Sequence, residues 1–287
     1  MPENPRGADP LRLVIYCDEA HTSTRLRRYH HFYGGLLVEE SRAGRLEGLL
    51  RDCAGRLGLM REAKWQNVDR TTVGKMEAFV DAFFDAIQRG EGKLRIMYLD
   101  ARFRARNLGP YQRQHGFYIL YYQFLTRAFG LPYLLGELRR PVVLRLLFDK
   151  LPDTNVKSAT FKAFLRDIPK TRRFRRYRLS IPADGIGELD SRKHRLAQGI
   201  DLVIGALGFA LNRLYKPAGT RPGGVERTAA KKRLARHIVR RLRDCRVKNI
   251  GITTGLDGQG ANLYHHPARV WVLRPSDFAI DERYRGG

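Results

Sequence analysis

Runs of apolar and β-branched residues, each bounded by polar or glycine-containing turns, predict the strands of an α/β protein. Two of these runs, Leu11–Cys17 and His31–Val38, follow each other closely enough to form an antiparallel hairpin. The other strand-like runs are Lys93–Asp100, Pro141–Asp149, Tyr177–Ile181 and Arg269–Leu273.

Apolar residues spaced three and four positions apart predict the helices. The clearest amphipathic pattern is Thr71–Gln88, and it ends just before Gly90. The segment Arg61–Val68, just before this helix, is expected to be too polar for the core. The other expected helices are Arg42–Leu57, Tyr111–Phe129, Lys157–Asp167, His194–Arg213 and Arg227–Arg246.

These elements favour one α/β domain with a basic C-terminal extension. Residues 1–10 are expected to be disordered or extended, and residues 11–215 to form the domain. In residues 216–287, Lys216–Gly224 has the proline and glycine content of a linker, and the basic helix and closing strand that follow are expected to pack on the same domain.

The charge of the chain points to a polyanionic partner. In 287 residues, 54 Lys and Arg stand against 29 Asp and Glu, which gives a formal net charge of +25. Such a surface attracts nucleic acid and gains affinity by releasing counterions from the phosphates. An arginine-rich genome or a hot habitat is the alternative explanation of the same excess.

Cysteine content and hydropathy predict a cytoplasmic protein. The three cysteines are Cys17, Cys53 and Cys245; they are widely separated and form no CxxC pair, which argues against disulfides and a zinc site. The N-terminus lacks a signal-peptide pattern. The most apolar stretch, Leu196–Leu211, is too short for a bilayer and contains Asp201, so no membrane association is expected.

Carboxylates recur at the ends of the predicted strands. Asp18, Asp100 and Asp149 each stand at the carboxyl end of such a strand, where ligand sites collect in open α/β sheets. Taken alone, each of them is also a common turn former or helix cap, and for Asp100 the cap is an equal alternative. Gln198 and Asp201 lie three residues apart and share one face of an apolar helix, where a buried Asp needs a partner or a metal.

Several carboxylates at strand ends and on a facing helix suit divalent-metal catalysis. Mg²⁺ and Mn²⁺ prefer oxygen ligands, and a pair of such ions shares carboxylates while activating a water and stabilising a leaving oxygen. Phosphodiester cleavage is therefore the chemistry that this residue pattern favours.

A family resemblance rests on five motifs in order: CDEA, FYGGLLV, REAKWQNV, LLFDK and LDSRKHRLAQGIDLVIGA. Together they resemble the bacterial family known as domain of unknown function 3800, across most of residues 11–215. The resemblance implies a ribonuclease H-like mixed sheet flanked by helices, a metal-dependent nuclease site holding two Mg²⁺ or Mn²⁺ ions, and an association with mobile elements or phage defence.

The resemblance also implies roles for individual residues. The catalytic and metal-binding carboxylates would be Asp18, Glu62, Asp149 and Asp201. Supporting positions would be Glu19, Lys64, Ser191 and Gln198, with Asp100 open between ligand and cap. The chain departs from the family pattern at Ala20-His21 and at Gly199. His21 suits a solvated loop, with a substrate contact or proton shuttle as the alternative.

Two basic stretches are candidates for nucleic-acid binding. Lys170–Arg178 interleaves basic residues with Phe174 and Tyr177, a composition suited to phosphate contacts and base stacking. Arg227–Lys248 has the periodicity of a basic amphipathic helix. A solvated basic face is the alternative for both stretches. The residues expected to contact nucleic acid are Arg172, Arg173, Arg175, Arg176, Lys231, Lys232, Arg233, Arg236 and Arg240.

The sequence therefore predicts a metal-dependent nuclease acting on DNA or RNA. One alternative is a non-catalytic nucleic-acid-binding protein that keeps the same fold. Another is a structural component of a defence system, in which the basic extension binds an acidic partner protein.

Overall fold

The structure is a computed structural model that describes residues 9–20, 28–59, 61–138, 140–149, 155–214, 224–247 and 264–284. His21 and most of the expected linker Lys216–Gly224 lie outside the described residues. Within the described residues, no helix combines the length and the apolar character that crossing a membrane requires.

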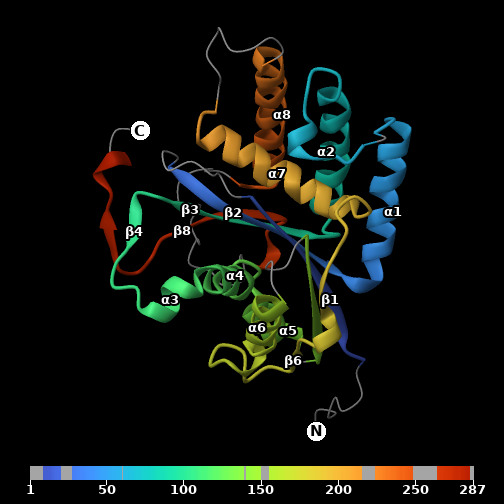
Figure 1. Cartoon of the computed structure of the whole chain (residues 1–287). Coiled ribbons are helices and arrows are strands. Elements are labelled where there is room, and N and C mark those ends of the chain that lie inside the picture. The colour runs from blue at the N-terminus through green and yellow to red at the C-terminus, as the bar shows by residue number, and fades with distance from the viewer. Residues whose placement is uncertain are drawn as a thin grey trace.

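A mixed sheet of seven strands forms the centre of the described structure, in the order β6-β5-β1-β2-β3-β8, with β7 also pairing with β5 (Figure 1). The strands are β1 (Leu11–Ala20), β2 (Tyr29–Glu39), β3 (Lys93–Asp100), β5 (Val142–Phe148), β6 (Leu179–Ser180), β7 (Ile186–Glu188) and β8 (Ala268–Leu273). The first three strands are antiparallel neighbours, whereas β5 runs parallel to β1 and β8 runs parallel to β3. Because β1 and β5 are parallel, their carboxyl ends meet at one edge of the sheet.

Helices cover both faces of the sheet (Figure 1). One face is packed by α1 (Glu40–Arg56), α2 (Val73–Gln88), α7 (Arg195–Leu211) and α8 (Gly224–Asp244). On the other face lie α4 (Gly116–Arg127), α5 (Leu131–Leu138) and α6 (Asn155–Arg166), preceded by the short helix α3 (Pro110–Gln114). The expected α/β class, a mixed sheet flanked by helices, is confirmed.

Side chains alternate between these two faces along β1, as the geometry of a strand requires. Val14 and Tyr16 pack with α2 and α7, while Leu13, Ile15 and Cys17 pack with the α4–α6 layer. All five are buried. The alternation decides which layer each polar residue at the end of β1 faces.

The C-terminal elements belong to the same body. Strand β8 extends the central sheet next to β3, and α8 packs on α2 and α7. Between α2 and α8, Glu77 pairs with Arg233, Asp81 with His237, and Asp85 with Arg241. The acidic residues are four apart on α2 and the basic residues four apart on α8, so each pair lies about one turn from the next.

The expected helix Tyr111–Phe129 is two helices, α3 and α4, because the backbone of His115 leaves the helical region. Gly130, with a φ of +64°, then separates α4 from the unexpected helix α5. The expected strand Tyr177–Ile181 shortens to β6, because the Tyr177 amide closes a turn on the carbonyl of Phe174.

Some short elements were not expected from the sequence. Strands β4 (Phe103–Ala105) and β9 (Phe278–Ile280) form a small separate sheet, and β7 joins the main one. The 3₁₀ turns are η1 (Trp65–Asn67), η2 (Ile168–Lys170), η3 (Ala183–Gly185) and η4 (Glu282–Tyr284). These segments hold too few residues to show a hydrophobic period.

Candidate functional site

Asp18 and Asp149 lie side by side at the carboxyl edge of the sheet. Asp18 occupies a position on β1 whose side chain faces α7, and it is 9% exposed. Cys17 pairs in register with Phe148 on β5, and the Asp149 amide donates to the Cys17 carbonyl at 3.1 Å. The parallel pairing therefore brings together two carboxylates that are 131 positions apart in the sequence.

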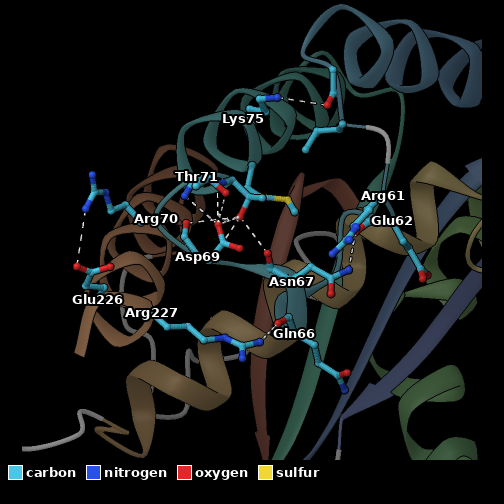
Figure 2. Close-up of a pocket in the computed structure, with 14 residues that line it drawn as sticks. Arg61, Glu62, Gln66, Asn67, Asp69, Arg70, Thr71, Lys75, Glu226 and Arg227 are labelled. Atoms are coloured by element: carbon cyan, nitrogen blue, oxygen red, sulfur yellow. Dashed lines mark hydrogen bonds and ion pairs between the residues drawn. The ribbon is translucent and has the colours of Figure 1, made fainter. Parts of the chain in front are cut away.

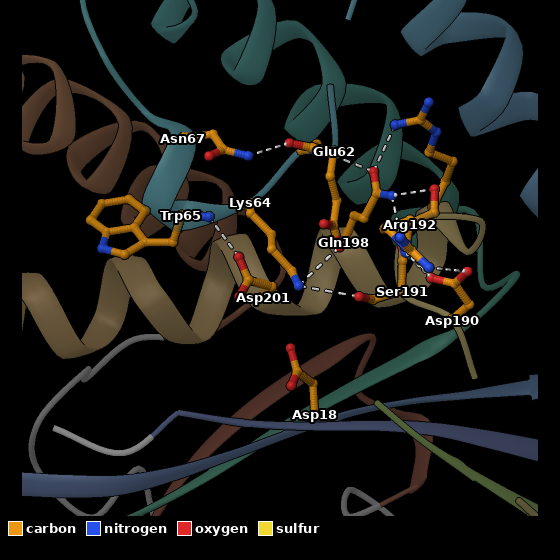
Figure 3. Close-up of polar contacts among 12 residues, drawn as sticks. Asp18, Glu62, Lys64, Trp65, Asn67, Asp190, Ser191, Arg192, Gln198 and Asp201 are labelled. Carbon is orange, nitrogen blue, oxygen red and sulfur yellow. Dashed lines mark hydrogen bonds and ion pairs between the residues drawn. The ribbon is translucent and has the colours of Figure 1, made fainter. Parts of the chain in front are cut away.

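Gly34 lets α7 approach the sheet beside Asp18. Gly34 is the β2 residue paired with Asp18, and a Cβ atom there would lie 2.5 Å from Cγ2 of Ile200 and 2.7 Å from Cγ2 of Ile204. Only glycine allows this contact without displacing the helix. The close packing places Asp201 on the α7 face above Asp18, and the Asp18 side chain points toward it in Figure 3.

The segment Arg61–Val68 is fixed to α7 by hydrogen bonds from its backbone amides to side chains of the helix. The Trp65 amide donates to Oδ2 of Asp201 at 2.6 Å, and the Ala63 amide donates to Oε1 of Gln198 at 3.1 Å. Ala63 and Val68 are fully buried. The expectation that this segment is too polar for the core is therefore wrong at these two residues, which anchor it while its polar side chains stay near the surface.

Two glycines of α7 accept neighbouring aromatic rings. A Cβ at Gly199 would lie 2.5 Å from the ring of Phe83, and a Cβ at Gly205 would lie 2.3 Å from Trp65. Glycine at position 199 thus has a packing reason: the ring of Phe83 occupies the space that a side chain would need.

Lys64 and Glu62 complete the group of charged side chains over Asp18 (Figure 3). The Lys64 ammonium pairs with Oε1 of Glu62 at 3.0 Å and donates to the Ser191 hydroxyl at 3.2 Å. Gln198 is fully buried and donates to the Ser191 carbonyl at 2.7 Å. Ser191 and Gln198 therefore hold the lysine and the Arg61–Val68 segment in place.

Burial and mutual repulsion raise the pKa values of the two central carboxyl groups. Burial raises the pKa of Asp18 well above its ordinary value, and the charges of Asp201 and Asp149 raise it further. Burial also raises the pKa of Asp201 to about 6, although the Trp65 amide and Lys64 oppose the shift. Burial lowers the pKa of Lys64, but the hydrogen bond and charge of Glu62 and the charges of Asp149 and Asp201 outweigh it, so the net shift is upward.

We call Asp18, Glu62, Asp149 and Asp201 the carboxylate cluster. Its chemistry fits Mg²⁺ or Mn²⁺, because all donors are carboxylate oxygens and a bound cation would relieve their repulsion. The described residues contain no group of three His, Cys, Asp or Glu side chains already placed to hold a metal ion. Binding would therefore require side chains of the carboxylate cluster to move, and Lys64 supplies positive charge there in the present arrangement.

Asp100 lies outside the carboxylate cluster. It accepts hydrogen bonds from the backbone and guanidinium of Arg102, and it lies 3.5 Å from Nε of Arg28. The register places it two strands from β1 and four residues beyond Ile96, the β3 residue at the level of Asp18. Strand geometry makes this separation about 16 Å. Asp100 therefore stabilises the turn at the end of β3 through Arg102 and lies apart from the carboxylate cluster.

Glu19 faces the opposite side of the sheet. It receives the hydroxyl hydrogen bond of the buried Tyr121, which lies on α4. Its backbone amide donates to Oδ1 of Asp18 at 2.7 Å, and its charge adds to the rise in the pKa of Asp18, whose main cause is burial. Glu19 can thus orient Asp18, but its own carboxylate points toward Tyr121 and not toward the carboxylate cluster.

The basic stretch Lys170–Arg178 lies far from the carboxylate cluster. The Val142 amide at the start of β5 donates to the Arg178 carbonyl, whereas Asp149 follows the end of the same strand, about 23 Å away by strand geometry. The arginines expected to bind nucleic acid here are exposed: Arg172, Arg173, Arg175 and Arg176. The expected stacking role of Phe174 is wrong, because that ring is fully buried in the core.

Some basic side chains of α8 make contacts with other parts of the protein. Arg233 makes a two-pronged contact with Glu77 at 2.9 and 2.6 Å, and Lys231 lies over the ring of Trp65 at 5.1 Å. Lys232 is half-buried. Arg236 and Arg240 are exposed, and so is Arg233 despite its pair with Glu77, so these three expected nucleic-acid contacts of α8 reach solvent.

Sequence reasoning missed basic residues that lie closer to the carboxylate cluster. Arg195 donates to Oε1 of Gln198 at 2.7 Å, and the charge of Glu62 contributes to the raised pKa of Arg192, whose main cause is the hydrogen bond to Asp190. The signal was present in the letters SRKHR, which end on the first residue of α7. It was weaker than the longer basic runs elsewhere in the chain.

The sequence matches no protein-family model and no curated protein. Among solved structures, the fold is similar to the crystal structure of Bst-RNase HIII in complex with Mn²⁺, at 13% identity over 80% of this chain and 70% of that chain, with a TM-score of 0.31. The Q54A mutant of Bst-RNase HIII matches at 12% identity over 79% of this chain and 69% of that chain, also with a TM-score of 0.31. Such low TM-scores carry no argument about the site, so the fold class rests on the sheet itself.

Proposed function

We propose that this protein is a divalent-metal-dependent nuclease that hydrolyses phosphodiester bonds of DNA or RNA. The observation that carries the proposal is the convergence of Asp18, Asp149 and Asp201 from β1, the end of β5 and α7, with Glu62 beside them. Burial raises the pKa values of Asp18 and Asp201, and the charges of neighbouring carboxylates add to the rise, so the fold holds these groups together at a cost. A fold keeps such a costly group most readily where it has a use.

The residues of the site would have three different roles: metal binding, charge neutralisation and positioning. Asp18, Glu62, Asp149 and Asp201 would hold the metal ions, and two Mg²⁺ or Mn²⁺ ions bound there supply an activated water and stabilise the leaving oxygen. Lys64 is placed to neutralise charge on a substrate phosphate as it approaches. Gln198 and Ser191 fix Lys64 and the Arg61–Val68 segment, so that the charged groups keep their relative positions.

The test is cleavage of labelled single- and double-stranded DNA and RNA with Mn²⁺ or Mg²⁺. We expect Asp18→Asn and Asp201→Asn to abolish cleavage while keeping the fold and the affinity for nucleic acid. Asp52→Asn, an exposed substitution on α1, is the matched control and should cleave like the wild type. Full activity in either cluster variant would refute the proposal.

A non-catalytic nucleic-acid-binding protein is the second candidate. Lys64 favours it, because its ammonium already contributes positive charge beside Glu62, Asp149 and Asp201. Isothermal calorimetry separates the two functions. Heat of Mn²⁺ binding that disappears in Asp18→Asn supports the nuclease, whereas salt-sensitive nucleic-acid binding without any metal binding supports the second candidate.

A further inference from the structure

A cavity of about 740 Å³ lies next to the carboxylate cluster (Figure 2). It is formed by Gly58 and Leu59, by residues between Arg61 and Met76, and by the first turn of α8. The polar side chains that matter here are Arg61, Glu62, Gln66, Lys75 and Arg227. Its volume lies in the range of ordinary ligand pockets.

Two acidic residues of the cavity, Asp69 and Glu226, have their own partners within the protein. The Asp69 carboxylate accepts hydrogen bonds from the amides of Thr71 and Thr72 at 2.8 and 2.9 Å, and the hydrogen bond from the Thr71 hydroxyl is the main reason that its pKa is lowered. Glu226 lies 3.7 Å from Arg70, and both side chains are mostly exposed. An exposed ion pair of this kind contributes little to stability, and its members can readily form other contacts.

The cations of the cavity keep their charge available. The Lys75 ammonium donates to the Gly58 carbonyl at 3.3 Å, and the Arg227 guanidinium donates to the Gln66 carbonyl. Both acceptors are neutral, so the positive charges are positioned without being cancelled. Arg61 is an exposed third cation at the same cavity. Guanidinium and ammonium groups held in this way suit phosphate oxygens.

Glu62 connects the cavity to the carboxylate cluster. It lines the cavity, and its carboxylate pairs with Lys64. The pKa of Lys64 is raised by its hydrogen bond to Glu62 and by the charges of Glu62, Asp149 and Asp201. Glu62 and Asn67 are labelled both in the view of the cavity and in the view of the site (Figures 2 and 3). A polymer with a phosphate at the carboxylate cluster therefore has a basic path leading away from it on this side.

We propose that the cavity binds the phosphate backbone of a nucleic-acid strand on one side of the cleavage position, through Arg61, Lys75 and Arg227. The inference rests on the proposed function for the position of the strand. It assigns the contacts nearest the chemistry to Arg61 between α1 and α2, to Lys75 in the first turn of α2, and to Arg227 at the start of α8. The basic stretch Lys170–Arg178, at the other end of β5, is left with at most a distant contact.

The test measures binding of a labelled oligonucleotide by fluorescence anisotropy in EDTA, so that no cleavage is needed. We expect the double variant Arg61→Gln/Lys75→Gln to weaken binding about 10- to 100-fold and to lower the slope of log K against log salt by about 2, one for each lost phosphate contact. Arg227→Gln should weaken binding in the same direction.

The matched control is Arg12→Gln/Arg51→Gln, which removes two exposed charges on β1 and α1. It should change affinity by less than about threefold, the effect of a slightly weaker overall field. Circular dichroism melting confirms that each variant is folded. Equal losses in the two double variants, or wild-type binding by Arg61→Gln/Lys75→Gln, would overturn the proposal.

A competition arm tests the size of the ligand. If inorganic phosphate or a nucleoside monophosphate binds as tightly as the oligonucleotide, and the double variant loses that binding, the cavity is a small-anion site and the proposal fails. Failure of the proposed function looks different, because it leaves the wild type without metal-dependent cleavage while the cavity variants still lose oligonucleotide affinity.

Discussion

The backbone amide of Trp65 donates a 2.6 Å hydrogen bond to Oδ2 of Asp201, across 136 positions of sequence. The bond fixes the segment between α1 and α2 to the face of α7 that lies over Asp18. It also satisfies one oxygen of a carboxylate that burial would otherwise penalise. The same contact thus positions Glu62 and Lys64 and keeps Asp201 near them.

The raised pKa of Asp201 predicts a pH-dependent stability of the metal-free protein. The carboxyl group has an ordinary pKa of 3.8 and a pKa of about 6 in the fold. An acid whose pKa is raised on folding favours the native state while protonated, so its contribution is full below about pH 4 and lost as pH rises through about 6. This difference between the two pKa values corresponds to at most about 3 kcal/mol of unfolding free energy.

Urea unfolding at several pH values between 4 and 7 measures this effect. The difference in unfolding free energy between wild type and Asp201→Asn should change across that window, with the variant gaining relative stability toward pH 7. A difference that stays constant with pH would show that Asp201 does not titrate in this range.

Substitution of Gly34 should disturb the site through packing. A Cβ at Gly34 meets the side chains of Ile200 and Ile204, so Gly34→Ala should push α7 away from β1 and cost about 1–3 kcal/mol. Because Asp201 moves with α7, metal-dependent cleavage should fall as well. Gly34→Ala/Ile200→Ala, which reopens the space, should recover part of the activity.

Gly44→Ala on α1 is the control for Gly34→Ala, because a Cβ there meets nothing within 4 Å. It should leave cleavage unchanged and raise stability by about 0.5–1 kcal/mol, since alanine is the better helix former. Equal effects of the two glycine substitutions on cleavage would contradict the packing argument.

Asp100→Asn should lower stability without removing activity. Asp100 is almost fully buried and holds the guanidinium of Arg102, so the substitution weakens a charged pair and costs about 1–3 kcal/mol. Cleavage per folded molecule should stay at the wild-type level, because Asp100 lies outside the carboxylate cluster. Activity that falls as far as in Asp18→Asn would show that Asp100 is a ligand after all.

Tyr121 is expected to be a positioning residue for Asp18. Its hydroxyl binds the Glu19 carboxylate, and the Glu19 amide binds Oδ1 of Asp18. Tyr121→Phe should lower the free energy of unfolding by about 1 kcal/mol or slightly more. It should also weaken Mn²⁺ binding in calorimetry.

Tyr118→Phe is the matched control for Tyr121→Phe. Tyr118 lies on the same helix, and its hydroxyl donates to the Lys157 carbonyl at 2.9 Å. The control should lose similar stability and keep the wild-type Mn²⁺ affinity. Equal Mn²⁺ affinities in both variants would reduce Tyr121 to a structural role.

The sequence by itself predicted the strand and the helix that carry two residues of the carboxylate cluster, Asp18 and Asp201. The apolar run Leu11–Cys17 predicted the strand that carries Asp18, and the three-residue spacing of Gln198 and Asp201 placed both on one face of a helix. Such predictions succeed because side-chain periodicity is a local property of strands and helices. Lys93–Asp100 was predicted with its observed bounds for the same reason.

Only the tertiary structure decided which of these residues meet. Asp100 and Asp149 end similar strands, but parallel pairing puts Asp149 beside Asp18, while the strand order puts Asp100 two strands away. Likewise, the densest basic run, Lys170–Arg178, lies at the end of β5 opposite to Asp149. Scattered basic residues such as Arg195 lie closer to the carboxylate cluster. Periodicity states which face a residue occupies, whereas strand order and contacts such as Trp65 with Asp201 depend on hydrogen bonds between segments that are distant in the chain.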